Sequence, residues 1–186
     1  MSKNVLVIGT GTIGEPLIGL LAEHKESLGL DKVIFFKRTP LSEERGKVEA
    51  LLRKGAEIVS TNDALSEFHQ LGFNEIKDVE LAYEQSDVII DCTPSGNDNW
   101  EKIYSSLSQD KRFMAQGSEH GFGPFFAWGI NNEILKDESN KFLIASCNTH
   151  NIASIVKAFA LDQQRDLLEG KFVCLRRAND VSQNDS

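Results

Sequence analysis

The stretch Val5-Leu-Val-Ile-Gly9-Thr-Gly11-Thr-Ile-Gly14 decides the fold of this chain. Four consecutive apolar residues predict a strand buried on both faces, because a strand with one solvent-exposed face would alternate apolar and polar side chains. The glycines allow a tight turn, a close approach of the backbone to a pyrophosphate and the packing of a helix on the strand. The start of that helix offers unpaired N–H groups to a phosphate. We interpret the stretch as a dinucleotide-binding turn; glycines that serve packing alone are the alternative.

Apolar runs of strand length recur along the chain, at residues 5–8, 33–36, 57–59, 88–90, 113–115, 142–145 and 172–175. They are continuous rather than alternating, and most intervals between them are long enough for a crossover helix. Helical spacing follows Gly14 and recurs after residue 151, in the stripes Ile13, Leu17, Leu20, Leu21 and Ile152, Ile155, Val156, Phe159. The polar segment 61–85 is expected to hold helix and loop beside the sheet. The pattern predicts an α/β fold with a Rossmann-type, doubly wound, mostly parallel sheet.

Composition narrows the classes of function. The 186 residues contain 20 Lys and Arg against 28 Asp and Glu, a net charge of −8, which opposes binding to nucleic acid or to an anionic membrane. The 3 cysteines are widely spaced and indicate neither a disulfide framework nor a metal site. No apolar run approaches the roughly 18 residues of a membrane span. We expect a cytoplasmic protein that acts on a small molecule and whose thiols are reduced.

The second strand ends in Lys37-Arg38-Thr39, where an NAD-selective site usually has an acidic residue. Two cations and a hydroxyl suit a 2′-phosphate, so Lys37 and Arg38 predict NADP, with NAD as the alternative cofactor. A solvated basic strand end is the other interpretation.

The strand at 88–90 leads through Asp91 into Cys92-Thr93-Pro94-Ser95-Gly96. Ligands of parallel α/β sheets bind at the carboxyl ends of the strands. Thr93 and Pro94 could therefore contact the cofactor through their backbone, although an ordinary loop fits the pattern equally well. Cys92 is expected to be a buried small apolar side chain.

The strand at 142–145 is followed by Ser146-Cys147-Asn148-Thr149-His150 and a helix. The dipole and the free N–H groups of a helix N-terminus favour the thiolate form of a cysteine there. We therefore predict that Cys147 is a nucleophile that attacks an aldehyde carbon. Asn148 and Thr149 could serve an oxyanion or a phosphate, and Ser146 could cap the helix. A structural cysteine is the alternative.

Histidine is the usual base for such a thiol, and the chain has His24, His69, His120 and His150. His24 and His69 are expected at the surface. His120 and His150 lie nearer to Cys147 in the predicted fold, but neither is clearly its partner.

Together these motifs resemble the archaeal, type II phosphorylating glyceraldehyde-3-phosphate dehydrogenases. The resemblance rests on five motifs in order: Gly9-Thr-Gly11-Thr-Ile-Gly14, Asp91-Cys-Thr-Pro-Ser-Gly96, Gln116-Gly-Ser-Glu-His120, Ser146-Cys-Asn-Thr149 and Arg176-Arg-Ala-Asn-Asp180. It implies that Cys147 forms a thioester that inorganic phosphate converts to an acyl phosphate. It further implies a cofactor or substrate role for a set of matching residues: Thr12, Ile13, Gly117 and Arg177 for the cofactor, and Ser146, Asn148, Thr149 and Arg176 for substrate or phosphate.

The family's subunit is longer, and its catalytic histidine lies further along than this chain reaches. The resemblance therefore implies a nucleotide-binding domain at 1–145 and the beginning of an α+β catalytic domain at 146–186, with a homo-oligomer as the usual assembly. His150, Asn151 and Ser95 depart from the family's motifs. A semialdehyde or acyl-phosphate reductase of the same mechanism, and a dinucleotide-binding module without catalysis, are the alternative functions.

Overall fold

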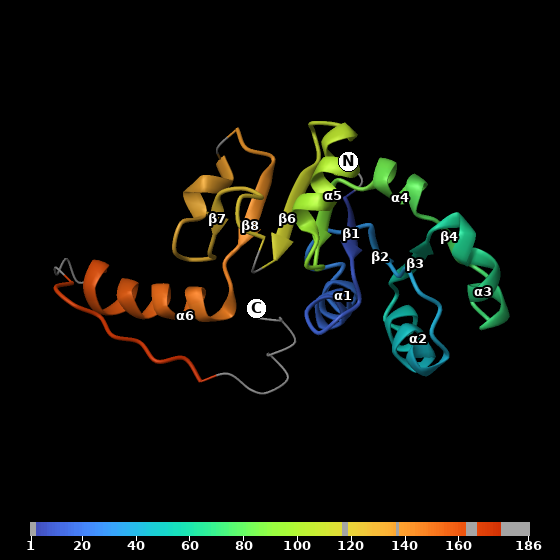
Figure 1. The fold of residues 1–186 in the computed structure, drawn as a ribbon, viewed down its shortest axis with the longest axis horizontal. Helices are drawn as coiled ribbons and strands as arrows, with labels where there is room; N and C mark the ends of the chain where they lie inside the picture. The colour runs from blue at the N-terminus through green and yellow to red at the C-terminus, as the bar shows by residue number, and fades with distance from the viewer. Residues whose placement is uncertain (1–2, 117–118, 137, 163–166, 176–186) are drawn as a thin grey trace.

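The computed structural model describes residues 3–116, 119–136, 138–162 and 167–175 (Figure 1). Within these residues the strands are β1 (Asn4–Ile8), β2 (Lys32–Phe36), β3 (Glu57–Ser60), β4 (Lys77–Asp78), β5 (Val88–Asp91), β6 (Arg112–Gln116), β7 (Phe125–Phe126) and β8 (Lys141–Ile144). They form one sheet in the order β4-β3-β2-β1-β5-β6-β8-β7, and every pair in it is parallel. The predicted α/β, Rossmann-type sheet is confirmed.

The helices connect these strands and, in the described residues, comprise α1 (Gly14–Glu23), α2 (Arg45–Arg53), α3 (Leu65–Gln70), α4 (Val79–Gln85), α5 (Gly96–Lys102) and α6 (Cys147–Val156). Short 3₁₀ segments lie at Ser42–Glu44, Asn62–Ala64, Tyr104–Ser106 and Asn132–Lys136, and a π-helical turn at Lys157–Leu161 continues α6. Helices α3 and α4 fall in the segment that the sequence assigned to helix and loop.

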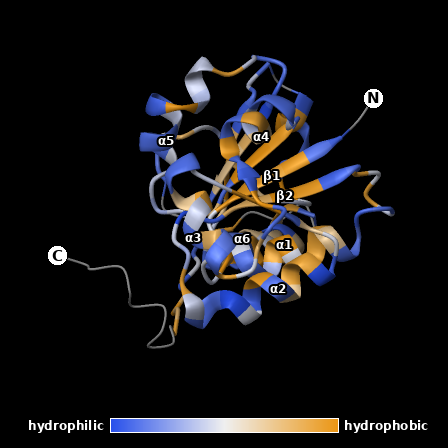
Figure 2. Ribbon diagram, turned by 90° about the vertical axis from the view of Figure 1, so that its right-hand side faces the viewer, coloured by the Kyte–Doolittle hydropathy of each residue, from blue (hydrophilic) through white to orange (hydrophobic). Residues whose placement is uncertain are grey.

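The sheet is covered on both faces because successive side chains of each strand point to opposite sides. One core contains alternate strand residues with side chains of α1 and α2: Val5, Val7, Val33, Phe35, Ile18, Ala22, Val48 and Leu51. The other contains the intervening strand residues with side chains of α4 and of the segment after α5: Leu6, Ile8, Ile34, Phe36, Val79, Ala82, Tyr83 and Tyr104. Figure 2 shows the apolar strands between these helices. Burial on both faces explains why the strand sequences are continuously apolar.

Strand β1 lies at the point where the strand order reverses, with β2 on one side and β5 on the other. The N–H of Cys92, just after β5, donates to the carbonyl of Ile8 at 2.8 Å. The loops that follow β1 and β5 are thereby joined at the carboxyl edge, where ligands of such sheets bind.

The structure corrects three details of the sequence prediction. Residues 172–175 form no strand, since the backbone there has no partner strand in the described residues. The short strands β4 and β7 were missed because each has two residues and depends on a neighbouring strand. On α1 the buried positions include Ile18 and Ala22, whereas Ile13 and Leu20 of the predicted stripe are exposed.

In the parts of the chain that the structure describes, no helix combines the length and apolar character needed to cross a membrane. Helix α6 extends beyond the sheet (Figure 1), and Ile155 on it and Phe159 in the turn that continues it are exposed. The predicted stripe on this segment therefore faces outward in part.

Candidate functional site

The glycines of the turn after β1 have different surroundings. Gly9 has φ +95°, a conformation that side chains with a Cβ rarely adopt. A Cβ on Gly14 would lie 2.0 Å from the carbonyl oxygen of Gly9, so α1 can pack this closely on the turn only with glycine there. A Cβ on Gly11 would meet no atom within 4 Å, because this position faces open space. Two glycines thus shape the turn, and the third leaves room in front of it.

Backbone donors of this turn are available to a ligand. Gly11, Thr12 and Ile13 are exposed, and in the described residues their N–H groups donate to no other backbone or side-chain group. The carbonyls of Gly11 and Ile13 accept from the first turn of α1, at 3.0 Å and 3.2 Å. The free N–H groups and the positive end of the α1 dipole form an anion-binding arrangement.

The two cations after β2 differ in their surroundings. Lys37 is buried, with 7% of its side chain exposed, and its ammonium donates to the carboxylate of Glu44. Arg38 is exposed and has no salt bridge to a described residue. Of this predicted pair, Arg38 is therefore the side chain that reaches solvent.

The loop after β5 is organised by Asp91, the last residue of the strand, which is 1% exposed. Its Oδ1 accepts from the N–H and the hydroxyl of Thr93 at 2.8 Å and 2.6 Å. Its Oδ2 accepts from Asn99 Nδ2 and from the hydroxyl of Tyr104, both at 2.7 Å. Burial, the charge of Asp91 and the hydrogen bond to it raise the pKa of Tyr104 well above its usual value, so that Tyr104 remains a donor. The carboxylate thereby fixes the backbone at Thr93.

A second carboxylate joins this loop to the one after β6. Glu119 is buried, and its Oε2 accepts from the N–H of Asn97 at 2.9 Å, in the first turn of α5. Asn97 Nδ2 in turn donates to the carbonyl of His120 at 3.0 Å. A Cβ on Gly96 would lie 3.2 Å from Glu119 Cγ, so the two loops fit tightly. Asp91 and Glu119 are both in motifs that carry the resemblance, but the sequence analysis gave neither residue a role. Asp91 could have been recognised as a charged residue that directly ends an apolar strand.

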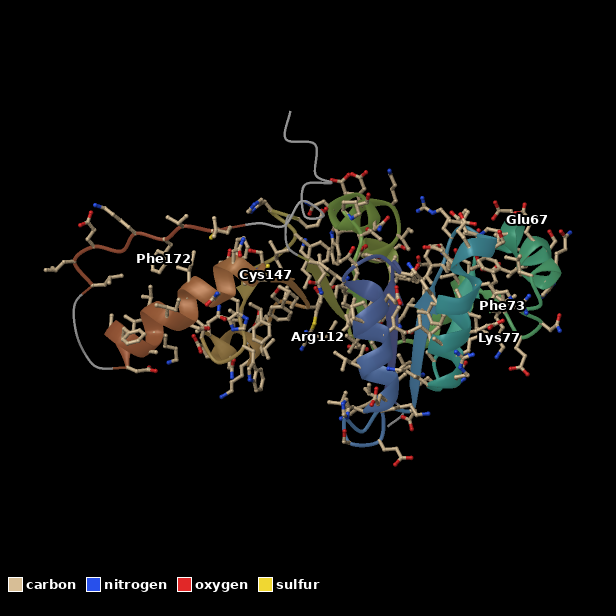
Figure 3. All side chains as sticks on the ribbon, turned by 90° about the horizontal axis from the view of Figure 1, so that it is seen from below. Glu67, Phe73, Lys77, Arg112, Cys147 and Phe172 are labelled. Carbon is tan, nitrogen blue, oxygen red and sulfur yellow. The ribbon has the colours of Figure 1, made fainter. Side chains whose placement is uncertain are left out.

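The cysteines have different environments. Burial, with the charge of Asp91 adding to it, raises the pKa of Cys92 to about 12, which agrees with the expectation that Cys92 is a small apolar side chain rather than a nucleophile. Cys147 is exposed and is the first residue of α6, as the sequence placed it. Figure 3 shows it near the start of this helix.

Ser146 is the N-cap of α6, as predicted. Its Oγ accepts from the N–H of Thr149 at 3.3 Å and lies 2.9 Å from Thr149 Oγ1. The serine fixes the first turn of the helix, and with it the position of Cys147. Asn148 is in the same turn.

No described histidine forms a hydrogen bond with Cys147. His150 Nε2 instead lies 3.0 Å from the carbonyl oxygen of Trp128. The ring of His120 packs edge-on against Phe125, with centroids 5.8 Å apart. His24, which ends α1, and His69, in α3, are both exposed, as expected.

The parallel sheet brings the described candidates to one edge. The glycine turn, Lys37, Thr93 and Cys147 follow the carboxyl ends of β1, β2, β5 and β8, respectively. Since β8 is the third strand from β1 in the order, these two strands are about 14 Å apart at the usual strand spacing. Gly117, Arg176 and Arg177 lie outside the described residues.

A hollow of about 760 Å³ lies elsewhere, beside β3, β4 and α4, and is lined by residues such as Ile58, Phe73 and Lys77. Figure 3 shows Phe73 and Lys77 toward one end of the molecule, well away from Cys147. None of the predicted site residues lines this hollow.

Comparison with known proteins finds relatives with one recurring name. No family model matches the chain. The chain is 27% identical over 159 residues to a glyceraldehyde-3-phosphate dehydrogenase of Pyrobaculum calidifontis, covering 84% of this chain and 44% of the relative. It is 26% identical to proteins of the same name from Sulfolobus acidocaldarius, over 95% of the chain and 49% of the relative, and Methanobrevibacter smithii, over 97% and 52%. The chain thus spans about half the length of the curated relatives it matches.

Among solved structures, glucose dehydrogenase from Haloferax mediterranei matches with a TM-score of 0.44 and 16% identity, over 84% of this chain and 41% of that one. A thermostable alcohol dehydrogenase from Pyrobaculum aerophilum matches with a TM-score of 0.38 and 16% identity, over 85% and 41%. At these TM-scores, neither likeness carries an argument. The sequence relatives do: over most of its length the chain is similar to archaeal glyceraldehyde-3-phosphate dehydrogenases, so the resemblance predicted from the motifs is confirmed.

Proposed function

We propose that the chain is the nucleotide-binding part of an NAD(P)-dependent, phosphorylating glyceraldehyde-3-phosphate dehydrogenase. One observation carries the proposal: a single parallel sheet places an open glycine turn after β1 and an exposed cysteine at the start of α6, after β8, on the same edge. The names of the relatives support an oxidoreductase of this kind.

The residues at this edge fit a dinucleotide. The turn at Gly9, Gly11 and Gly14 has free N–H groups and open space for a pyrophosphate, with Thr12 and Ile13 exposed beside it. The end of β2, with Lys37 and Arg38, would face the adenosine ribose, and Thr93 and Pro94 the nicotinamide side. By the resemblance, Gly117 and Arg177 would complete the cofactor site. NADP is the proposed cofactor, with NAD as the alternative.

The chemistry proposed for Cys147 begins with attack of its thiolate on the aldehyde carbon. The carbonyl oxygen takes up a proton, which gives a thiohemiacetal. The nicotinamide, when bound, supplies the acceptor for the hydride that leaves this carbon. As the hydride leaves, the hydroxyl group releases its proton to water, and a thioester on Cys147 results. An oxygen of inorganic phosphate then attacks the thioester carbon, the thiolate leaves, and the product is 1,3-bisphosphoglycerate.

The surroundings of Cys147 suit an anionic substrate. The α6 N-terminus attracts negative charge, and Ser146, Asn148 and Thr149 add polar groups in its first turn. Arg176 is proposed to bind phosphate, on the basis of the resemblance. Aldehyde and inorganic phosphate are thus the proposed small-molecule partners, in the cytoplasm and in a homo-oligomer, with the nucleotide-binding domain at 1–145 and the catalytic domain beginning at 146.

The test follows NADPH absorbance after NADP, glyceraldehyde 3-phosphate and phosphate are mixed with the chain. The proposal expects turnover that depends on phosphate and disappears in Cys147→Ser, while NADPH binding, measured by its fluorescence, persists in that variant. A matched Cys174→Ser variant, also an exposed cysteine, should retain turnover. Turnover that survives Cys147→Ser would refute the thioester mechanism, and turnover with another semialdehyde alone would favour a related acyl-phosphate reductase.

A second function, a dinucleotide-binding module without catalysis, is favoured by one observation. No described side chain forms a hydrogen bond with Cys147, and the nearby His150 is engaged with Trp128. This function predicts NADPH binding without turnover and with slow alkylation of Cys147 at neutral pH. Rapid alkylation of Cys147 would exclude it.

A further inference from the structure

The buried Lys37 at the end of β2 is bound to an acidic residue that comes from a different segment. Glu44 ends the 3₁₀ segment that follows β2, and its Oε2 accepts from the Lys37 ammonium. The side chains of Lys37 and Glu44 are 7% and 27% exposed, so water screens this pair less than it screens a surface ion pair. The positive charge of Lys37 is therefore already compensated before any ligand arrives.

Further charges connect this pair to the glycine turn. Lys47 Nζ lies 3.9 Å from Glu44 Oε1 and 3.8 Å from Glu15 Oε2, and Glu15 is in the first turn of α1. Together with Thr10 of the glycine turn, these side chains line one small hollow. The Lys37–Glu44 pair thus lies at the end of β2 and beside the glycine turn, where the adenosine ribose would lie.

Glu44 keeps its negative charge at this place. The hydrogen bond from Lys37 and the charges of Lys37 and Lys47 hold the pKa of Glu44 below its usual value, although desolvation acts in the opposite direction. A 2′-phosphate carries about two negative charges at neutral pH. The carboxylate repels it, whereas a ribose 2′-hydroxyl can donate to a carboxylate.

We infer that Glu44 determines the cofactor preference of this site: by holding Lys37 and placing a carboxylate at the end of β2, it disfavours a 2′-phosphate relative to a 2′-hydroxyl. The inference rests on the proposed function, since it concerns the same dinucleotide site. Arg38, exposed and without a salt bridge to a described residue, is the cation left to attract a phosphate. Glu44 therefore limits the preference for NADP that Arg38 favours, and its removal would free the Lys37 ammonium to attract the 2′-phosphate as well.

The test compares dissociation constants of NADPH and NADH, measured by fluorescence titration, in the full chain and in Glu44→Gln. The glutamine can still accept from Lys37 but carries no charge. The ratio of the NADH constant to the NADPH constant should rise about tenfold or more, the change that 1.4 kcal/mol of relieved repulsion produces. Glu43→Gln is the matched control. This substitution changes the net charge by the same amount one residue away, and the Glu43 carboxylate contacts Ser42 rather than Lys37. It should leave the ratio within about twofold, as expected for a screened surface charge.

Glu44→Gln leaves the buried Lys37 ammonium without its counter-charge, so the substitution is repeated in a Lys37→Gln chain, where no buried cation remains. The ratio should rise there too, because the repulsive carboxylate is removed. An unchanged ratio in both backgrounds, with both cofactors still bound, would overturn the inference but not the proposed function. An equal rise in Glu43→Gln would also overturn it, because a general charge effect would then suffice. If the unmodified chain binds neither cofactor, the proposed function fails, and the inference with it.

Discussion

Gly11 and Gly14 belong to one turn but are required for different physical reasons. A Cβ at position 14 would overlap the Gly9 carbonyl oxygen, at 2.0 Å, whereas a Cβ at position 11 would enter empty space. We expect Gly14→Ala to lower the free energy of unfolding by about 3 kcal/mol, because α1 must move away from the turn. Gly11→Ala should keep the free energy of unfolding within about 0.5 kcal/mol and weaken NADPH binding at least about tenfold, because its methyl group occupies the space of the pyrophosphate.

Urea unfolding and NADPH fluorescence titration of the two variants check this pair of outcomes. Gly46→Ala serves as the control, since a Cβ there meets no atom within 4 Å and Gly46 is in α2, outside the turn. It should leave NADPH binding unchanged. A stable Gly14→Ala chain, or a Gly11→Ala chain with full affinity, would contradict the roles assigned to these glycines.

The three cysteines should differ in how readily they are alkylated. The pKa of Cys92 is raised to about 12, so this side chain remains a protonated thiol as the pH rises from 7 to 9, and the thiolate needed for alkylation is scarce. Cys147 and Cys174 are exposed. Iodoacetamide at pH 8 should therefore label Cys147 and Cys174 and leave Cys92 unlabelled, as measured by peptide mass spectrometry. Denatured protein should be labelled at all three positions. Equal labelling of Cys92 in the native protein would contradict the raised pKa of this half-buried thiol.

At the scale of elements, Asp91 joins β5 to the start of α5 and to the segment after it. The carboxylate accepts from Thr93, Asn99 and Tyr104, and all these partners lie after the residue in the chain. Asp91→Asn places an amide N–H₂ against a donor in a buried site. We expect the variant to lose about 3 kcal/mol of unfolding free energy, because a buried group loses charge-assisted hydrogen bonds.

The control for this substitution is Asp98→Asn, which makes the same chemical change at an exposed position. The Asp98 side chain is 68% exposed and pairs only loosely with Lys102, at 3.7 Å. Asp98→Asn should lower the free energy of unfolding by less than about 0.5 kcal/mol, as measured by thermal or urea unfolding. Equal losses in the two variants would mean that the network around Asp91 adds nothing to stability.

The short and isolated elements are those that the sequence could not predict. β4 and β7 have two residues each, and their backbone is extended because a longer strand lies beside it. The converse holds at 172–175, where an apolar run has no neighbouring strand in the described residues and forms none. Strand formation depends on a partner, and the partner is not encoded in the run itself.

On the scale of the whole molecule, β8 completes the sheet. Its residues Phe142 and Leu143 are buried, and the strand lies between β6 and β7. We expect a fragment of residues 1–145 to unfold cooperatively, because it retains every strand of the sheet. A fragment of residues 1–140 lacks β8 and exposes Phe113, so it should unfold at a lower urea concentration.

Circular dichroism during urea unfolding compares the two fragments with the full chain. NADPH binding by the longer fragment would support a nucleotide-binding domain at 1–145, since the glycine turn and the loop after β5 are both within it. Equal stability of the two fragments would contradict the place given to β8 in the core.

The site was predictable where its residues are adjacent in sequence. The glycine turn, the N-cap Ser146 and the position of Cys147 each depend on a strand followed directly by a helix, and the structure has them as expected. The partners of Lys37 and of the loop after β5 were not predictable. Glu44 and Glu119 reach their partners from separate segments, so no local pattern signals them.

By itself, the sequence determined the parallel α/β sheet and the carboxyl edge at which the candidate residues gather, because continuous apolar strands and intervening helices leave few other ways to bury these side chains. The tertiary structure decided which charges remain available there. Lys37 is neutralised by Glu44, Arg38 is exposed, and Cys92 is half-buried while Cys147 is open to solvent. The reason is physical: burial and charge pairing depend on side chains that folding brings together from distant parts of the chain.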